Sequence, residues 1–396
     1  MIKKNKPKRL FKENQPTNKV EKNKKRKTID PSNFIKKSTP TKSREYKATT
    51  TFNEMNLHDK LKRALKIKGF LNPTEIQAES IESLIKKKNI IGIANTGTGK
   101  TGAFLIPIIH RLLTEEKRFQ TLVVLPTREL ALQVEKEFQS LSSDLHLSSA
   151  SFIGGTNLDK DFQKLKSRND IVIGTPGRLI DLIKQGALNL TKFEVLILDE
   201  FDRMLDMGFI RDVEKILNAM KQRKQTMLFS ATIDKNQENL INKIVANPVR
   251  IHIHSGNSTT NMVDQDIIDV QGRDKFILFK DLISGNDFRK VLVFAETKRT
   301  VDRLRKKLMK SGIPSETIHG DKSQNYRIKA LNNFKSGKTK ILVATDVAAR
   351  GIDIEDISHV INYQAPSSMD SYIHRIGRTG RAGKKGYAYT FVNELN

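Results

Sequence analysis

The residues whose chemistry is clearest lie between positions 94 and 101, which read Ala-Asn-Thr-Gly-Thr-Gly-Lys-Thr. An apolar run precedes them and a helix-like stretch follows, which is the setting of a phosphate-binding loop. Its glycines allow backbone N–H groups to turn toward a phosphate. Lys100 would reach the outer phosphates, and the Thr101 hydroxyl would hold Mg²⁺. We therefore expect the chain to bind a nucleoside triphosphate and Mg²⁺ through Asn95, Thr96, Gly97, Thr98, Gly99, Lys100 and Thr101.

Two acids, Asp199 and Glu200, directly follow the apolar run 195–198. Ligands of a parallel α/β sheet collect beyond the carboxyl ends of its strands, so both acids are expected to face the nucleotide. Asp199 would hold Mg²⁺ partly through water, and Glu200 would polarise the attacking water. Acids at strand ends can also serve only to solvate a loop, but the phosphate-binding loop favours catalysis.

A third candidate is the basic cluster at 374–381, which reads His-Arg-Ile-Gly-Arg-Thr-Gly-Arg. Arg378 and Arg381 lie three residues apart, a spacing that puts both on one side of a helical turn. Facing a γ-phosphate, they would stabilise the charge that develops during its transfer. A basic patch for RNA is the other interpretation, and spacing alone does not separate the two.

The elements that must position these residues follow an alternating α/β pattern. Short apolar runs, separated by amphipathic helical patterns, predict parallel strands that are covered on both faces. A polar interruption divides the pattern into two similar halves, although only the first half has a phosphate-binding loop. We predict two tandem α/β domains, with a tail at 1–49, a first domain at 50–254, a linker at 255–261 and a second domain at 262–396.

The composition favours a polyanionic partner. The formal net charge is +27, and residues 1–50 alone carry 17 Lys/Arg against four acids. Nucleic acid is the first candidate and an anionic membrane the second. No apolar stretch is long enough to span a bilayer, the start lacks a secretory pattern, and there is no cysteine. We expect a cytoplasmic, monomeric protein whose basic tail is disordered and is either an RNA arm or merely solvated.

Taken together, the motifs resemble those of DEAD-box RNA helicases of superfamily 2, over nearly all of residues 52–392. Besides the sites above, the resemblance rests on the motifs at 73–77, 126–130, 154–155, 175–178, 199–202, 230–232, 319–321, 345–346 and 350–353. Connecting sequence at 202–209 is most similar to the bacterial RhlE-like branch. The resemblance implies two RecA-like domains, ATP as the nucleotide and RNA as the partner.

The resemblance also assigns roles to individual residues. Gln77 would read the adenine edge, and Phe52 would cover the base unless it is a core residue. Further nucleotide contacts would come from Phe70, Thr74, Gly351, Asp353, Arg378 and Arg381. Sequence-independent RNA backbone contacts would come from Pro126, Thr127, Arg128, Gly154, Gly155, Thr175, Pro176, Gly177, Arg178, Thr345 and Asp346. Coupling between the two sites would fall to Asp202, Ser230, Thr232 and His374.

One residue departs from the family pattern, because Phe201 stands where the family has alanine. It either packs under the sheet edge, which we favour, or alters how hydrolysis is coupled to unwinding. The implied activity is an RNA-dependent ATPase that unwinds short duplexes or remodels RNA–protein complexes by ATP-driven domain closure. Ribosomal precursors or RNA-degradation machinery would be its partners. An ATP-gated RNA clamp without unwinding and a DNA-directed helicase are the alternatives.

Overall fold

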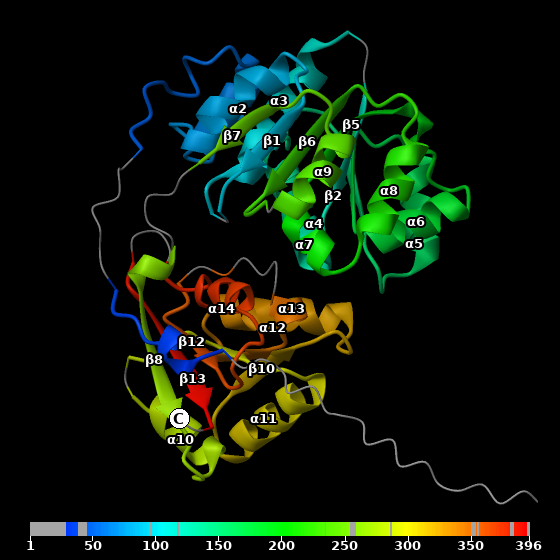
Figure 1. Ribbon diagram of the computed structural model, residues 1–396. Coiled ribbons are helices and arrows are strands. Elements are labelled where there is room, and N and C mark those ends of the chain that lie inside the picture. Colours follow the sequence, from blue (N-terminus) through cyan, green and yellow to red (C-terminus); the bar gives the residue numbers. More distant parts are fainter. Residues whose placement is uncertain are drawn as a thin grey trace, which may run out of the picture.

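Two parallel β-sheets, each covered by helices, form the body of the protein (Figure 1). The computed structural model describes residues 29–38, 46–95, 97–116, 119–233, 235–253, 259–285, 287–349, 354, 356–380 and 384–393. Within these residues no helix is both long and apolar enough to cross a membrane. The predicted α/β class with two sheets in tandem is confirmed.

The first sheet has seven strands in the order β3-β4-β2-β5-β6-β1-β7, and every neighbouring pair is parallel. The predicted apolar runs form its central strands. The strands are β1 (Ile90–Ile93), β2 (Gln120–Val124), β3 (Ser149–Phe152), β4 (Ile171–Gly174), β5 (Phe193–Leu198), β6 (Gln225–Ser230) and β7 (Val249–His252). Gly92 allows β1 to pack closely, since a Cβ there would lie 2.7 Å from the Phe229 ring.

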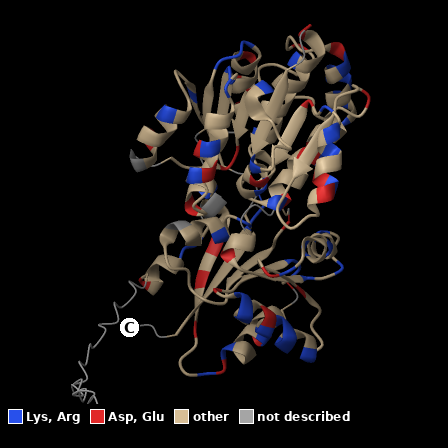
Figure 2. Ribbon diagram, turned by 90° about the vertical axis from the view of Figure 1, so that its right-hand side faces the viewer, with Lys and Arg blue, Asp and Glu red and all other residues tan. Residues whose placement is uncertain are grey.

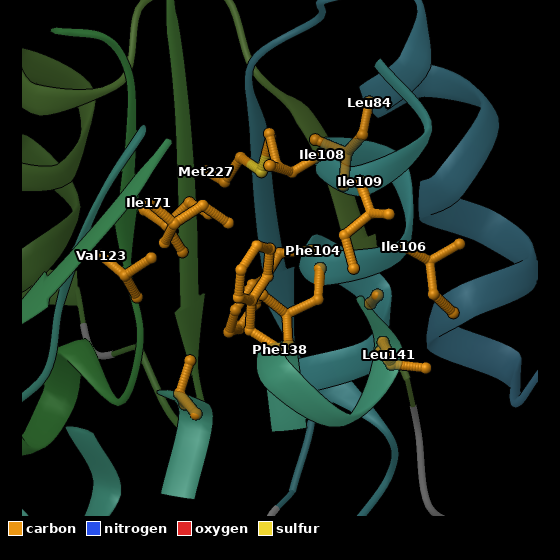
Figure 3. Close-up of a cluster of buried hydrophobic side chains, with 14 of the residues drawn as sticks. Leu84, Phe104, Ile106, Ile108, Ile109, Val123, Phe138, Leu141, Ile171 and Met227 are labelled. Atoms are coloured by element: carbon orange, nitrogen blue, oxygen red, sulfur yellow. The ribbon is translucent and has the colours of Figure 1, made fainter. Parts of the chain in front are cut away.

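Helices cover both faces of this sheet, because its strands are apolar on both sides. The first face packs against α1 (Asp59–Ile67), α2 (Glu75–Ile85), α3 (Lys100–Thr114) and α4 (Arg128–Leu141). The second packs against α5 (Leu158–Lys166), α6 (Pro176–Lys184), α7 (Phe201–Asp206), α8 (Ile210–Ala219) and α9 (Lys235–Ile244). Figure 3 shows the first of these cores, in which Phe104 and Phe138 lie among aliphatic side chains of strands and helices.

The second sheet has six strands in the order β10-β11-β9-β12-β13-β8, again all parallel. Its strands are β8 (Val263–Asp269), β9 (Val291–Phe294), β10 (Ser315–Ile318), β11 (Ile341–Ala344), β12 (His359–Asn362) and β13 (Gly386–Val392). One face packs against α10 (Lys275–Ile283) and α11 (Lys298–Lys310). The other packs against α12 (Gln324–Lys335), α13 (Asp346–Ala349) and α14 (Met369–Ile376).

The chain passes from the first sheet to the second between β7 and β8. A 3₁₀ helix, η3 (Thr259–Met262), leads into β8. Residues 254–258 are outside the described part of the chain, and they include most of the linker expected at 255–261. The predicted linker therefore falls between the last strand of one sheet and the first strand of the other.

The tail expected at 1–49 needs a correction. Residues 1–28 and 39–45 lie outside the described residues, but residues 29–38 are packed on the second domain. They include the 3₁₀ helix η1 (Pro31–Phe34) and a β-bridge between Lys36 and Gln265. Figure 1 shows this dark blue segment beside β8, far from the blue and cyan helices of the first domain that follow it in sequence. The expectation of disorder fails here because Phe34 finds an apolar site in the other half of the chain.

Candidate nucleotide and RNA site

Apart from Phe52, Phe70, Thr74 and Gln77, which precede β1, the candidate residues of the first domain lie at or beyond the carboxyl ends of strands. These ends share one edge because the sheet is parallel. The sheet order separates them into two groups. Candidates for the nucleotide follow β5, β6 and β1, which are neighbours. Candidates for RNA follow β3, β4 and β2, which are also neighbours. Strand order thus places the two predicted sites side by side.

The phosphate-binding loop joins β1 to α3, as the sequence predicts. Lys100 is buried at the start of α3, and its Nζ donates a hydrogen bond to the Ala94 carbonyl at 2.9 Å. The Thr98 hydroxyl donates to the Asn95 carbonyl at 2.8 Å. Thr101 is partly buried in the first turn of α3, while Thr96 lies outside the described residues. The loop is folded back on itself around the ammonium group, ahead of a helix N-terminus.

Within this loop, Gly99 is the residue that packs against the start of α2. It has φ +95°, and a Cβ there would lie 2.6 Å from Thr74 Oγ1 and 2.7 Å from Gln77 Nε2. Gln77 Nε2 donates to the Gly99 carbonyl at 3.0 Å, and its Oε1 accepts from the Thr74 amide at 2.9 Å. Gln77 therefore ties the loop to the start of α2, with one end of its amide on Gly99 and the other on Thr74. Gly97, with φ +84°, is the other left-handed glycine of the loop.

Asp199 and Glu200 lie at the end of β5, and both are buried. Burial raises the pKa of Asp199 to about 6, and the positive charge of Lys100 opposes this shift. Asp199 Oδ1 accepts from the Glu200 amide at 2.9 Å. Glu200 adopts φ +53°, an unusual backbone conformation for a residue with a side chain, and its carboxylate is ion-paired with Arg203. Two carboxylates and an ammonium group therefore share one buried site.

Asp202 joins this site to the end of β6. Its amide donates to Ser230 Oγ at 3.2 Å, and its carboxylate accepts from Thr232 Oγ1 at 3.4 Å. Ser230 Oγ donates in turn to the Thr232 carbonyl at 2.6 Å. Phe201, which precedes Asp202, is fully buried in the core beneath the sheet. The structure thus places the departing residue in the packing role that we favoured.

The two aromatic candidates for the base differ in exposure. Phe52 is 3% exposed and belongs to the core of the first domain, and its amide donates to the Leu71 carbonyl at 3.0 Å. The ring is enclosed in the core, which is the second of the two roles expected for it. Phe70 is 37% exposed, with Lys68 Nζ 5.3 Å from its ring centroid. Phe70 is thus the more exposed of the two aromatic candidates.

The candidates for RNA meet around Arg128, at the start of α4. Thr127 caps this helix by accepting from the Leu130 amide. The Arg128 guanidinium lies against the glycine pair that follows β3, since a Cβ on Gly155 would lie 2.4 Å from its Nη1. Burial, followed by the positive charge of Arg327, lowers the pKa of Arg128. This crowding of positive charge suits a polyanion.

Arg178 forms the other half of this group, on α6 after Thr175, Pro176 and Gly177. Its Nη2 donates to the Thr156 carbonyl at 2.6 Å, and its Nη1 lies 3.2 Å from Asp161 Oδ2. Arg178 is thereby fixed to the loop that carries Gly154 and Gly155. The expected group from three separate motifs is brought together at one end of the sheet.

In the second domain the structure describes part of the expected set. Thr345 and Asp346 follow β11, and Arg375 of α14 binds the Asp346 carboxylate through two bonds of 2.6 and 2.7 Å. Arg375 is buried, and sequence reasoning gave it no role. Arg378 is also buried, with its Nε donating to the His374 carbonyl at 3.3 Å. The expected sites Gly351, Asp353 and Arg381 lie outside the described residues.

Sequence reasoning also missed a contact between the domains. Glu129 of α4 lies 2.9 Å from Arg327 of α12 and accepts from Gln324 Nε2 at 3.3 Å. Both charged side chains are largely buried there. Figure 2 shows charged segments where the two domains face each other. No local pattern marks Arg327, because it is one basic residue on a helix that carries several.

Comparison with known proteins identifies the family. A family model described as DEAD/DEAH box helicase matches residues 74–240, and one described as helicase conserved C-terminal domain matches residues 274–383. ATP-dependent RNA helicase CshA of Listeria monocytogenes is 42% identical over 87% of the chain and 66% of its own length. CshA of Bacillus subtilis is 40% identical over 87% of the chain and 70% of its own length. The chain belongs to the DEAD-box RNA helicase family.

The relatives named here are CshA proteins, so they do not support the RhlE-like branch. The chain spans about two thirds of their length.

Solved structures show the arrangement of the two halves. S. cerevisiae Dbp5 bound to RNA and ADP BeF3 is 30% identical and has a TM-score of 0.75 over 87% of the chain and 90% of its own. Mss116p bound to ssRNA and AMP-PNP is 31% identical, with a TM-score of 0.75 over 85% of the chain and 73% of its own. The helicase therefore has two tandem RecA-like domains, as expected.

Proposed function

We propose that this helicase is an RNA-dependent ATPase that opens short RNA duplexes or remodels RNA–protein complexes by ATP-driven closure of its two domains. The observation that carries the proposal is the shared edge of the first sheet. Lys100, Asp199 and Glu200 meet at the ends of β1 and β5, while Arg128 and Arg178 meet at the ends of β2 and β4. A change at the nucleotide can thus reach the neighbouring RNA site over one β2–β5 pair.

In the nucleotide site, Lys100 and the amides of residues 97–101 would bind the phosphates. Asp199 and the Thr101 hydroxyl fit Mg²⁺, because oxygen ligands suit this ion and Asp199 is a buried carboxylate that a cation would stabilise. The ion would neutralise charge on the phosphates. Glu200 would accept the proton of the attacking water, and Arg203 beside it would hold its carboxylate in place.

In the RNA site, Arg128 and Arg178 would bind phosphates, and the glycine pair at 154–155 would let the backbone of RNA approach closely. Such contacts ignore base identity, so sequence-independent binding is expected. Thr345 and Asp346 would add contacts from the second domain. Relatives bound to both RNA and a nucleotide are consistent with simultaneous binding.

Closure would link the two ligands, because each contacts both domains and therefore favours the other's binding. Asp202, Ser230 and Thr232 are the groups through which the nucleotide site would sense closure, together with His374 of the second domain. Arg378 and Arg381 would complete the phosphate site as arginine fingers. Phe201 would not interfere with this coupling, because it packs in the core and Asp202 keeps its hydrogen bonds to Ser230 and Thr232.

Steady-state ATP hydrolysis with and without single-stranded RNA tests the proposal, with Glu200→Gln as the control. RNA stimulation that is lost in Glu200→Gln would support an RNA-coupled ATPase. Loss of duplex in a strand-displacement assay would then separate a helicase from an ATP-gated clamp. Hydrolysis that ignores RNA, or that responds equally to DNA, would contradict the proposal.

For the cellular role, we propose a class of process and not a particular RNA. CshA-like rather than RhlE-like activity agrees better with the relatives found. Ribosome assembly and RNA turnover both need an enzyme that opens short duplexes without regard to sequence, and we propose a cytoplasmic role of this kind. Crosslinking of bound RNA in cells, followed by sequencing, would distinguish ribosomal precursors from messenger RNA.

A further inference from the structure

The segment 29–38 lies on the second domain although it precedes the first domain in sequence. It falls outside both ranges that the family models match. Beyond residue 46 the chain runs into the first domain, where the Phe52 amide is bonded to Leu71. The same chain end therefore contacts both domains.

An aromatic anchor holds the segment in place. Phe34 is 1% exposed, and its ring centroid lies 4.7 Å from that of Tyr372 on α14. The Tyr372 hydroxyl donates to Gln265 Oε1 of β8 at 3.0 Å. Burial of this degree is unusual for a residue in so polar and basic a stretch. The second domain therefore offers a formed apolar site, rather than a surface against which the segment merely rests.

Backbone pairing adds register to this anchor. The Lys36 amide donates to the Gln265 carbonyl at 3.0 Å, and the Gln265 amide donates back to the Lys36 carbonyl at 2.8 Å. The Ser38 amide donates to Asp264 Oδ1 at 2.7 Å. Because β8 is an edge strand of its sheet, its outer side is open to an added strand. The apolar site at Tyr372 and the edge of β8 together bind an aromatic residue that is followed by an extended segment.

We propose that residues 29–38 are a strap, which occupies a peptide-binding surface on the second domain and ties the two domains together at a second point. The tie is short, since the eight residue steps from Ser38 to Tyr46 span at most about 29 Å. A second tether limits how far the domains separate and raises the effective concentration of each near the other. The docked strap therefore favours closure on RNA, an effect that rests on the proposed function.

Disulfide trapping tests the docking without any assay of activity. The chain has no cysteine, so an introduced pair supplies the only thiols. Residues that exchange two backbone bonds have Cα atoms about 5.5 Å apart, which suits a disulfide. Lys36→Cys with Gln265→Cys should therefore crosslink on mild oxidation of the full chain. Lys36→Cys with Asp266→Cys is the matched control, since Asp266 is adjacent but on the opposite face of β8.

The expected result is a high crosslink yield for the 36/265 pair and a yield at least about fivefold lower for the 36/266 pair. Adding Phe34→Ala to the first pair should lower its yield to that of the control, because the aromatic anchor is lost. Equal yields from the two pairs, or a yield that Phe34→Ala leaves unchanged, would overturn the docking.

A matched proline pair tests the effect on closure. Lys36→Pro removes the amide that donates to Gln265, whereas Lys37→Pro changes the next residue, whose amide points away from β8. Lys36→Pro should raise the RNA concentration for half-maximal ATPase roughly fivefold and leave the maximal rate unchanged. Lys37→Pro should do neither. Identical curves for both variants would overturn the tether. Absence of RNA stimulation in the unaltered protein would instead contradict the proposed function. The crosslinking result does not depend on RNA stimulation, so it would still test the docking of the strap.

Discussion

Glu129 of the first domain and Arg327 of the second form an ion pair of 2.9 Å between α4 and α12. The residue before Glu129 is Arg128, whose guanidinium packs on the glycine pair at 154–155. One helical turn therefore contacts both the candidate RNA site and the other domain. RNA that binds Arg128 would act on the same turn that holds the second domain, which gives closure a direct structural route.

Removing the charge of Glu129 should weaken closure. Glu129→Gln leaves Arg327 near Arg128 without its carboxylate, and loss of one partner of a largely buried pair is costly. We expect the RNA concentration for half-maximal ATPase to rise about tenfold, which corresponds to about 1.4 kcal/mol. Titration of RNA at saturating ATP measures it.

The control for this prediction lies on the same helix. Glu137 of α4 is paired at 2.7 Å with Lys68, which belongs to the same domain. Glu137→Gln should therefore leave the RNA dependence unchanged. If both variants shift the curve equally, the pair with Arg327 has no special part in closure.

Gly99→Ala should weaken nucleotide binding, because the residue has φ +95° and a Cβ would lie less than 3 Å from Thr74 and Gln77. The strain of about 1–2 kcal/mol and these contacts would displace the loop that Gln77 holds. We expect ATP affinity to fall more than about tenfold, as measured by titration with a fluorescent ATP analogue. Gly186→Ala is the control. Gly186 has φ +69° in open space, so this variant should lose about 1 kcal/mol of stability and keep its ATP affinity.

Asp199 should make the stability of the ligand-free protein depend on pH. Burial raises its pKa to about 6, above the ordinary value of 3.8. The native state therefore binds the proton more tightly than the unfolded state, so this residue lowers the free energy of unfolding as pH rises from about 4 to 7. Asp199→Asn should remove that loss and be more stable than the unaltered protein at pH 8, with a smaller difference at pH 5. Urea unfolding at both pH values measures it. An equal effect of the substitution at both pH values would contradict the raised pKa.

Gly155→Ala should impair RNA binding specifically. Its Cβ would lie 2.4 Å from Arg128 Nη1, so the guanidinium must move, and φ +77° adds backbone strain. We expect RNA affinity to fall about tenfold while ATP affinity without RNA is retained. Fluorescence anisotropy with labelled single-stranded RNA in the presence of AMP-PNP measures the change. Unaltered RNA affinity would show that Arg128 does not bind RNA from its present position.

The sequence by itself determined the class of fold and the nucleotide site. The apolar runs at 122–125 and 195–198 predict buried strands because a parallel sheet covered on both faces needs such runs. The residues at 94–101 predict a phosphate-binding loop because its glycine, lysine and threonine residues are close together in the sequence. Asp199 and Glu200 follow from the same rule about strand ends. All of this information is local, so it can be recognised without knowledge of distant partners.

Only the tertiary structure decided the roles that depend on distant partners. Phe52, with a predicted role at the base or in the core, and Phe201, with a predicted role in packing or in coupling, are both enclosed in cores. Phe34 is anchored on Tyr372, more than three hundred residues away, and Glu129 meets Arg327 across two domains. An aromatic or charged side chain has the same local signature whether it is buried, paired or exposed. The environment of such a side chain is decided by the residues that folding brings next to it. Those residues lie far from it in the sequence.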